Sequence, residues 1–233
     1  LNNLFKLVSN SYRGDNFYRF PRMDYEMLKK YNEGIIASSA CLGGVLSNDY
    51  WDNIENGDKA VYAAMEKTVG SMMDIFGDRW YGELQWNNVP EQHALNKYII
   101  KMHEEFGIGL VSTCDSHYPN PDAWKDRELY KRLGWLNSKP DYDIGDLPQS
   151  RDDLKSELYP KNGDELFATY KRYAAKLGFS YDDKLVEESI ARTADIMRNR
   201  VEDFVPDTSV KLPSFVIPEG ETADSALAKI AVD

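Results

Sequence analysis

The stretch LVSTCDSHY at residues 110–118 places an aspartate and a histidine two positions apart after an apolar run. Because side chains at positions i and i+2 of a strand point to the same face, Asp115 and His117 can converge on one ion. Their carboxylate oxygen and imidazole nitrogen are ligands that Zn²⁺, Mn²⁺ or Fe²⁺ accepts. The alternatives for this D-x-H pair are a cap and a polar surface turn.

Two further residues could join such a site. Cys41 follows the short apolar run IIASSA and would add a thiolate, although a cysteine between alanine and leucine is also typical of a small core residue. Glu83, in YGELQ, could line the same cavity, but we interpret it mainly as a half-exposed strand glutamate. In α/β folds, functional groups gather at the carboxyl ends of the strands, where Cys41, Asp115 and His117 are predicted to lie.

The remaining cysteine and histidines receive structural interpretations. Cys114 points away from Asp115 on the predicted strand and is expected to fill space. His93 and His103 belong to one predicted helix and are expected on its surface or amphipathic face. The sequence has no glycine-rich dinucleotide loop, Walker loop, C-x-x-C, H-E-x-x-H or G-x-S-x-G motif.

Strand-like and helix-like segments alternate over the first part of the chain. Strands are predicted at 35–40, 79–85 and 108–115, and helices at 57–76, 90–106 and 120–135. Strand–helix units repeated in this way predict parallel strands joined by crossovers. They fit either an open α/β sheet or part of a (β/α) barrel.

The composition changes near residue 137. The segment 137–153 is rich in Asp, Pro, Ser and Gly and is predicted to be a long loop. Amphipathic helices are predicted at 164–179 and 183–201, and another helix from about Thr222. We therefore divide the chain into an α/β part, 1–136, and a mostly helical part, 137–233.

The bulk composition excludes several classes of protein. The chain has 233 residues, 42% hydrophobic and 29% charged, which suffices for a core, and no apolar run is long enough to span a membrane. Its net charge of −11 repels phosphate backbones, so this segment is not expected to grip nucleic acid directly. Two cysteines cannot form a disulfide framework, and we expect a cytoplasmic protein. Because residue 1 is Leu and already looks helical, we expect a fragment of a longer protein.

A set of segments in one order along the chain resembles a known family. They are NLFKLVSNSY, NFYRFPRMD, EGIIASSACLGG, IFGDRWYGELQ, VPEQHALNK, GIGLVSTCDSHY, PDAWKDRELY, ELYPKNGDEL and LPSFVIPEGETAD. Together they resemble the DNA polymerase III alpha subunits, the family C replicative polymerases, over nearly the whole chain. In that family this stretch belongs to the PHP (polymerase and histidinol phosphatase) domain and the start of the polymerase core, near the thumb.

The resemblance implies a partial, distorted (β/α) barrel of PHP type, followed by a mostly helical segment. It also implies that Cys41, Asp115 and His117 are metal ligands for Zn, Mn or Mg, whereas Glu83 falls in the ELQ element and is not counted as an established ligand. In the full-length protein it implies Mg-dependent DNA-directed DNA synthesis. The implied partners are a DNA primer-template, a sliding clamp and a separate proofreading exonuclease, with no membrane.

The chain also departs from the family pattern. The earliest ligand elements, beginning with an H-x-H, should lie before residue 1, and the polar residue usual after ELQ is replaced in ELQWNN. The catalytic aspartates of the polymerase should lie beyond residue 233. The chain alone is therefore expected to leave the metal site incomplete and to carry no nucleotidyl transfer.

Three functions stay open at this point. The complete PHP site could act as a 3′–5′ exonuclease or phosphoesterase, or the region could be a scaffold that stabilises the polymerase and docks a proofreading exonuclease. A stand-alone PHP phosphoesterase is the third, although the helical tail argues against it. A barrel without its first strands also has open edges, so we expect the isolated chain to associate or to repack.

Overall fold

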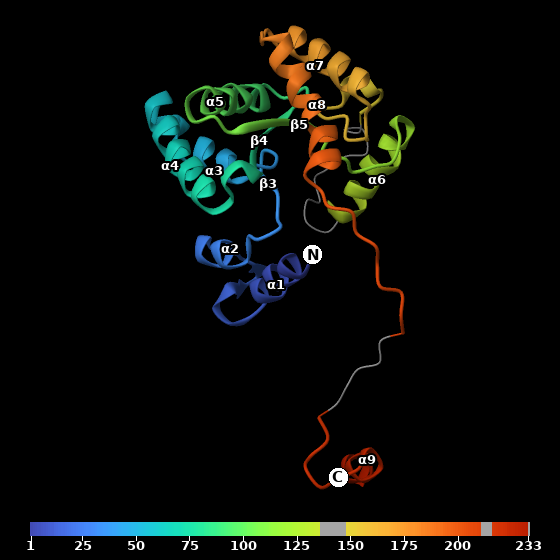
Figure 1. Cartoon of the computed structure of the whole chain (residues 1–233). Helices are drawn as coiled ribbons and strands as arrows, with labels where there is room; N and C mark the ends of the chain where they lie inside the picture. The colour runs from blue at the N-terminus through green and yellow to red at the C-terminus, as the bar shows by residue number, and fades with distance from the viewer. Residues whose placement is uncertain (136–147, 211–215, 233) are drawn as a thin grey trace. The chain divides into compact units, whose positions relative to one another are not determined.

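The computed structural model describes residues 1–135, 148–210 and 216–232 (Figure 1). Residues 1–200 form one compact unit and residues 201–233 form a second, and each is described by itself. Most of the loop predicted at 137–153 lies outside the described residues. Its last part contains a 3-10 turn at Arg151–Asp153.

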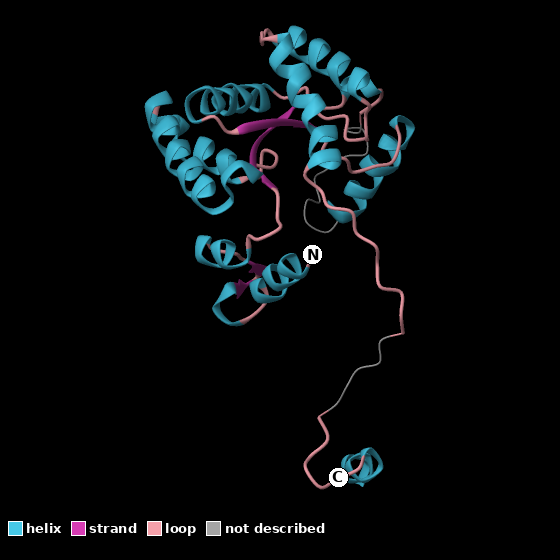
Figure 2. Cartoon of the chain, in the orientation of Figure 1, coloured by secondary structure: helices cyan, strands magenta, loops and turns pink. Residues whose placement is uncertain are grey.

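A three-stranded parallel sheet lies among the helices of the first unit (Figure 2). In spatial order its strands are β3 (Ala37–Ser38), β4 (Trp80–Gln85) and β5 (Gly109–Thr113). Because a helical segment separates each strand from the next along the chain, the parallel strand–helix arrangement predicted from the sequence is confirmed. The chain is an α/β protein.

The helices of the first unit agree with most of the predicted ranges. They are α1 (Asn2–Ser11), α2 (Tyr25–Tyr31), α3 (Val45–Asn53), α4 (Asp58–Phe76), α5 (Pro90–Phe106), α6 (Trp124–Trp135), α7 (Gly163–Leu177) and α8 (Asp183–Asn199). α5 has a proline in its first turn and ends at Gly107 in the left-handed conformation, so the helix begins and ends where these two residues predict. The sequence did not predict α3.

One face of the sheet is apolar and packs against helices. Leu84 and Trp80 are buried on this face, and Gly82 allows α5 to approach, since a Cβ at Gly82 would lie 2.6 Å from Ile99 Cγ2. α8 packs against β5, where the hydroxyl of Ser189 lies 2.7 Å from that of Ser112 on the same face. Figure 1 shows α5 and α8 beside β4 and β5.

The opposite face of the sheet is largely polar. The strand register places Ser38, Glu83, Gln85 and Thr113 on it, together with Tyr81. These are the side chains nearest to the carboxyl ends of the strands, where the candidate site residues follow.

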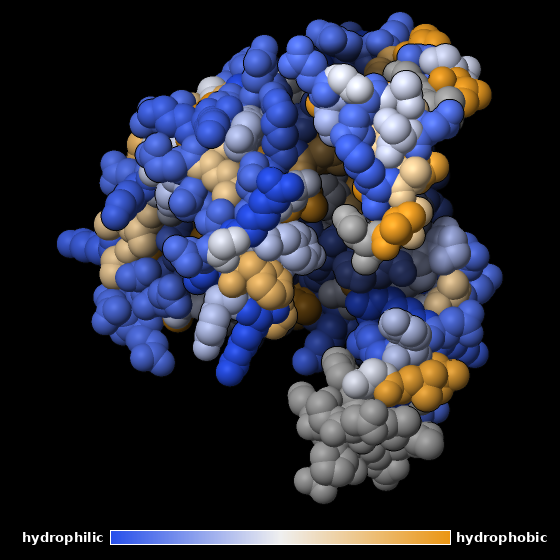
Figure 3. Space-filling model, turned by 90° about the horizontal axis from the view of Figure 1, so that it is seen from below, coloured by the Kyte–Doolittle hydropathy of each residue, from blue (hydrophilic) through white to orange (hydrophobic). Residues whose placement is uncertain are grey.

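The first residues form a small helical layer, and one arginine links it to the start of β4. α1 and α2 pack together, and an antiparallel hairpin, β1 (Phe17–Tyr18) and β2 (Phe20–Pro21), lies between them along the chain. The Arg79 guanidinium, just before β4, donates to the backbone oxygens of Asn32 and Ile35 at 2.7 and 2.6 Å. α1 and the residue that follows it leave apolar side chains exposed: Leu4, Phe5, Val8 and Tyr12. Figure 3 shows a mostly hydrophilic face with separate apolar patches.

Two strands are shorter in the structure than the sequence predicts. The strand predicted at 35–40 is reduced to Ala37–Ser38, because Ile35 donates its backbone N–H to Asn32 in a turn and Ala40 has a positive φ of 60°. The strand predicted at 108–115 ends at Thr113, because the backbone turns at Asp115, which has a φ of 45°. Both shortenings fall where the candidate ligands begin.

The second unit consists of extended residues and one described helix. α9 (Ala223–Val232) begins next to the predicted start at Thr222, whose hydroxyl accepts from the backbone N–H of Ser225. Among the residues that the structure describes, no helix combines the length and apolar character needed to cross a membrane. The division of the chain at 136/137 stays a prediction, and α8 packs on the sheet within the first unit.

Candidate metal site at the strand ends

Asp115 and His117 lie together in the loop after β5. Their side chains are 36% and 45% exposed, and His117 Nδ1 lies 3.9 Å from Asp115 Oδ1. Because β5 ends at Thr113, the argument from alternation along a strand does not place them; the turn at Asp115 does. An aspartate tolerates the left-handed conformation better than most residues, which suits this position.

The backbone fixes the tautomer of His117. Its Nδ1 lies 2.5 Å from the backbone oxygen of Asp115, and a carbonyl oxygen can only accept a hydrogen bond. In the neutral ring Nδ1 therefore carries the hydrogen, and Nε2 keeps its lone pair. Metal-ligating histidines are oriented in this way, with one ring nitrogen donating to an oxygen and the other free for the metal.

A later segment holds this loop in place. Leu158 O accepts from the backbone N–H groups of His117 and Tyr118, at 2.7 and 3.2 Å, and Tyr118 OH accepts from Leu158 N. The same segment contributes to a small apolar cluster beside the loop, made of Tyr118, Trp124, Leu154, Leu158 and Tyr159. The D-x-H loop is thus exposed at its side chains and anchored through its backbone.

Cys41 lies in a tight turn after β3. Gly44 donates its backbone N–H to Cys41 O at 2.8 Å, and a Cβ at Gly44 would lie only 2.0 Å from Ser39 O, so the turn requires glycine there. The Cys41 thiol is free and partly buried. These contacts are compatible with both interpretations of Cys41, a metal ligand and a small core residue.

Asp115 and His117 carry donor atoms of the kinds that a metal site uses. They offer a carboxylate oxygen and an imidazole nitrogen from one loop, which fits a divalent cation in donor chemistry. Within the described ranges, no group of three or more His, Cys, Asp or Glu side chains could hold a metal ion. Cys41 is therefore not brought into a common cluster with the D-x-H pair.

Glu83 is buried, and the expectation of a half-exposed strand glutamate is wrong. Its side chain is 9% exposed, in the middle of the polar face. Its carboxylate accepts hydrogen bonds from Ser38 Oγ and Thr113 Oγ1, both at 2.6 Å, and from Gln85 Nε2 at 2.9 Å. One carboxylate therefore connects side chains from all three strands of the sheet.

The expectation that His93 could lie on the surface of its helix is also wrong. It is fully buried on the inner side of α5, where Nε2 lies 3.0 Å from Asn87 O and Nδ1 lies 2.9 Å from Tyr181 OH. Burial lowers its pKa, the bond to Asn87 raises it, and the nearby Lys97 charge lowers it further, with a net shift downward. His93 thus connects α5 to the link between α7 and α8. His103, only partly buried, bonds the backbone oxygen of Ile108 through Nδ1.

Cys114 has the structural surroundings that were expected. It packs against the main core, and its sulfur accepts the backbone N–H of Lys161 at 3.4 Å. A cavity of about 450 Å³ opens here, beside the D-x-H loop. Its lining comes from the end of β5, the start of α7 and one side of α8, and includes Thr113, Ser116, Asn162 and Ile190.

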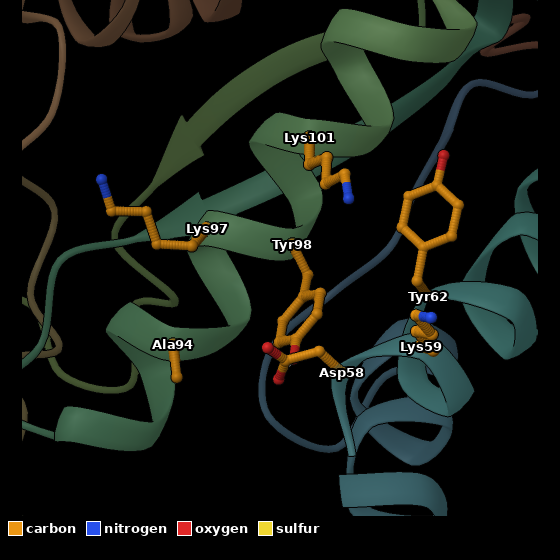
Figure 4. A pocket seen from close by; sticks show the side chains of 7 residues that line it. All are labelled: Asp58, Lys59, Tyr62, Ala94, Lys97, Tyr98 and Lys101. Atoms are coloured by element: carbon orange, nitrogen blue, oxygen red, sulfur yellow. The ribbon is translucent and has the colours of Figure 1, made fainter.

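A second cavity, of about 550 Å³, lies between α4 and α5, and its lining includes Lys59, Lys97 and Lys101 (Figure 4). Lys97 points away from the other two in this view and donates to Ser180 O, and Lys101 lies over the Tyr62 ring. Tyr98 OH donates to Asp58, and burial together with this carboxylate raises the pKa of Tyr98 to about 12. Two of the three lysines already have partners in the chain, so the groove is not assigned a ligand.

Sequence reasoning did not single out Ser38 and Thr113, which together bind Glu83. Hydroxyl residues at strand ends are common and carry no distinctive motif. Their one signal is position, since Ser38 and Thr113 fall on the same face as Glu83 once the strands are aligned.

Comparison with known proteins identifies the family. Residues 1–87 match the PHP domain, a range that includes Cys41 and Glu83 and ends before Asp115. The chain is 32% identical to a DNA polymerase III subunit alpha of Aquifex aeolicus over 99% of its own length, and 31% identical to that of Thermus aquaticus over 98%. It spans only 18% and 17% of these two relatives.

The fold agrees with this similarity. A short parallel sheet flanked by helices is consistent with a partial PHP-type barrel followed by further helices. The chain belongs to the DNA polymerase III alpha subunit family, as the PHP region of such a subunit.

Proposed function

We propose that this chain is a segment of a replicative polymerase whose full-length form carries out Mg-dependent, DNA-directed DNA synthesis in the cytoplasm. The observation that supports it is similarity to two polymerase alpha subunits over 98–99% of the chain, through the tail that follows the sheet. A stand-alone phosphoesterase would not need that tail. The primer-template and the sliding clamp would be bound by the full-length protein, since this segment carries a net charge of −11.

We further propose that the PHP region contributes Asp115 and His117, with Cys41, to a site for Zn, Mn or Mg. The fixed tautomer of His117 supports this role, because Nδ1 donates to the Asp115 backbone oxygen and Nε2 of this 45% exposed side chain keeps its lone pair. Further ligands would have to join Asp115 and His117, since no third Asp, Glu, His or Cys side chain does so within the described ranges. A bound divalent metal would supply an activated water and charge stabilisation for phosphodiester hydrolysis, the chemistry of a 3′–5′ exonuclease.

The alternative is a scaffold that stabilises the polymerase and docks a separate proofreading exonuclease. One observation favours it: within the described ranges no third Asp, Glu, His or Cys side chain joins the D-x-H pair. In that case the anchoring of the loop by Leu158 serves packing alone.

Metal content decides between the two proposals. The full-length protein is compared with its Asp115→Asn/His117→Ala double variant by elemental analysis after dialysis. Stoichiometric metal that is lost in the variant supports a metal site, and hydrolysis of a 3′ end is then measured on both. Equal metal content in the two proteins, or none in either, favours the scaffold.

A further inference from the structure

The buried carboxylate of Glu83 is bonded to the residues that precede both candidate ligand loops. Ser38 ends β3 three residues before Cys41, and Thr113 ends β5 two residues before Asp115. Both hydroxyls donate to Glu83 at 2.6 Å, one to each carboxylate oxygen. The central strand thus reaches both outer strands through a single side chain.

Each of the two loops contains a residue other than glycine with a positive φ. Ala40, directly before Cys41, has a φ of 60°, and Asp115 has a φ of 45°. This conformation is unfavourable for alanine and less so for aspartate, and it is maintained where the surroundings favour it. Ser38 and Thr113, on the polar face, each lie two residues before one of these positions.

We propose that Glu83 is a positioning residue, which holds the Cys41 loop and the Asp115–His117 loop at a fixed separation. This inference rests on the proposed metal site for its purpose, although the spacing itself can be measured without metal. Glu83 does not touch the ion in this proposal. It acts through Ser38 and Thr113.

A carboxylate suits this role for a chemical reason. When ionised it only accepts hydrogen bonds, and its two oxygens can accept from Ser38, Thr113 and Gln85 at the same time. Hydrogen bonds to a charged acceptor are shorter and stronger than those between neutral groups. A second bond adds to the link with β3, because Ser39 Oγ accepts from the backbone N–H of Glu83 at 2.9 Å.

The separation of the loops can be measured with spin labels. Gly43 and Ser116 are exposed, one in each loop, and the chain has only two cysteines, Cys41 and Cys114. Both native cysteines are replaced by serine, and labels are attached through Gly43→Cys and Ser116→Cys. Pulsed electron spin resonance then gives the distribution of distances between the two loops.

The key variant is Thr113→Val, which keeps the shape of the side chain and removes the hydroxyl. Thr113→Ser restores the donor and serves as the rescue. Thr169→Val is the matched control, because Thr169 is buried in α7 and its hydroxyl donates to Glu165 O within the same helix. Ser38→Ala tests the other end of the network at an exposed position, in case Thr113→Val does not fold.

The expected result is a narrow distribution in the parent and in Thr113→Ser and Thr169→Val. Thr113→Val and Ser38→Ala should broaden it, with loss of the parent distance. An unchanged distribution in both of these variants, or a broad one in the parent, overturns the inference. Metal content of the full-length protein is measured separately: a narrow distribution without metal binding leaves the positioning role standing and rejects the proposed metal site.

Discussion

The two faces of the central sheet are stabilised by different interactions. On one face Leu84 is fully buried against helices, in a core that includes Leu95, Ile99 and Leu110. On the other face Glu83, its neighbour in β4, is buried among hydroxyl and amide groups that all donate to it. Two adjacent residues of β4 therefore contribute different interactions: Leu84 packs in the apolar core, and Glu83 accepts hydrogen bonds.

The interactions on the two faces differ in how strongly they depend on geometry. Apolar packing depends mainly on buried area and volume and tolerates small shifts, whereas a hydrogen bond weakens steeply when its geometry is lost. The apolar face can therefore supply most of the stability. The polar face is better suited to fix the positions of the loops that follow it.

The largest expected effect is on the apolar face. Leu84→Ala removes a fully buried side chain and leaves a cavity, so it should lower the free energy of unfolding by about 2–5 kcal/mol. Urea denaturation followed by circular dichroism measures this loss. A change below about 1 kcal/mol would mean that Leu84 is not part of a packed core.

A smaller loss is expected on the polar face. Glu83→Ala leaves the donors of Ser38, Gln85 and Thr113 without their acceptor, at a cost of about 1–3 kcal/mol. Glu83→Gln retains one acceptor oxygen and should lose less. If both variants unfold at the same denaturant concentration as the parent, the network does not contribute to stability.

The burial of His93 predicts a pH dependence. Its pKa is lowered from about 6.5 in the folded chain, so below that pH the unfolded chain binds a proton that the folded chain does not. Stability is therefore complete above about pH 6.5 and should fall as the pH decreases, by up to about 1.4 kcal/mol per pH unit. Unfolding free energies between pH 7.5 and 5.5 test this in the parent and in His93→Gln, where the slope should be smaller. Equal slopes would assign the pH dependence to other groups.

The apolar face could be predicted from the sequence and the polar face only in part. Periodicity and the Gly107 stop placed α5 correctly, because both signals are local. The burial of Glu83 and His93 depends on partners far away in the sequence, such as Thr113 and Tyr181, which no local pattern reveals.

The candidate ligands illustrate the same limit. The D-x-H spacing correctly brought Asp115 and His117 together, but for a different reason from the one assumed. They meet in a turn with a positive φ at Asp115, and not as neighbours on a strand. Hydrophobic periodicity cannot detect such a turn, because it depends on backbone conformation and on the bonds to Leu158.

The smallest effect is expected in the D-x-H loop itself. Asp115→Asn keeps a residue that tolerates the left-handed conformation, and His117→Ala removes a side chain that is 45% exposed. Each should change the free energy of unfolding by no more than about 0.5 kcal/mol, since the backbone bonds to Leu158 remain. Chemical denaturation of the two variants beside Leu84→Ala and Glu83→Ala measures this ranking. A loss as large as that of Glu83→Ala would show that the pair stabilises the fold. Stability near that of the parent, combined with loss of metal from the full-length protein, would show that the pair binds metal without contributing to stability.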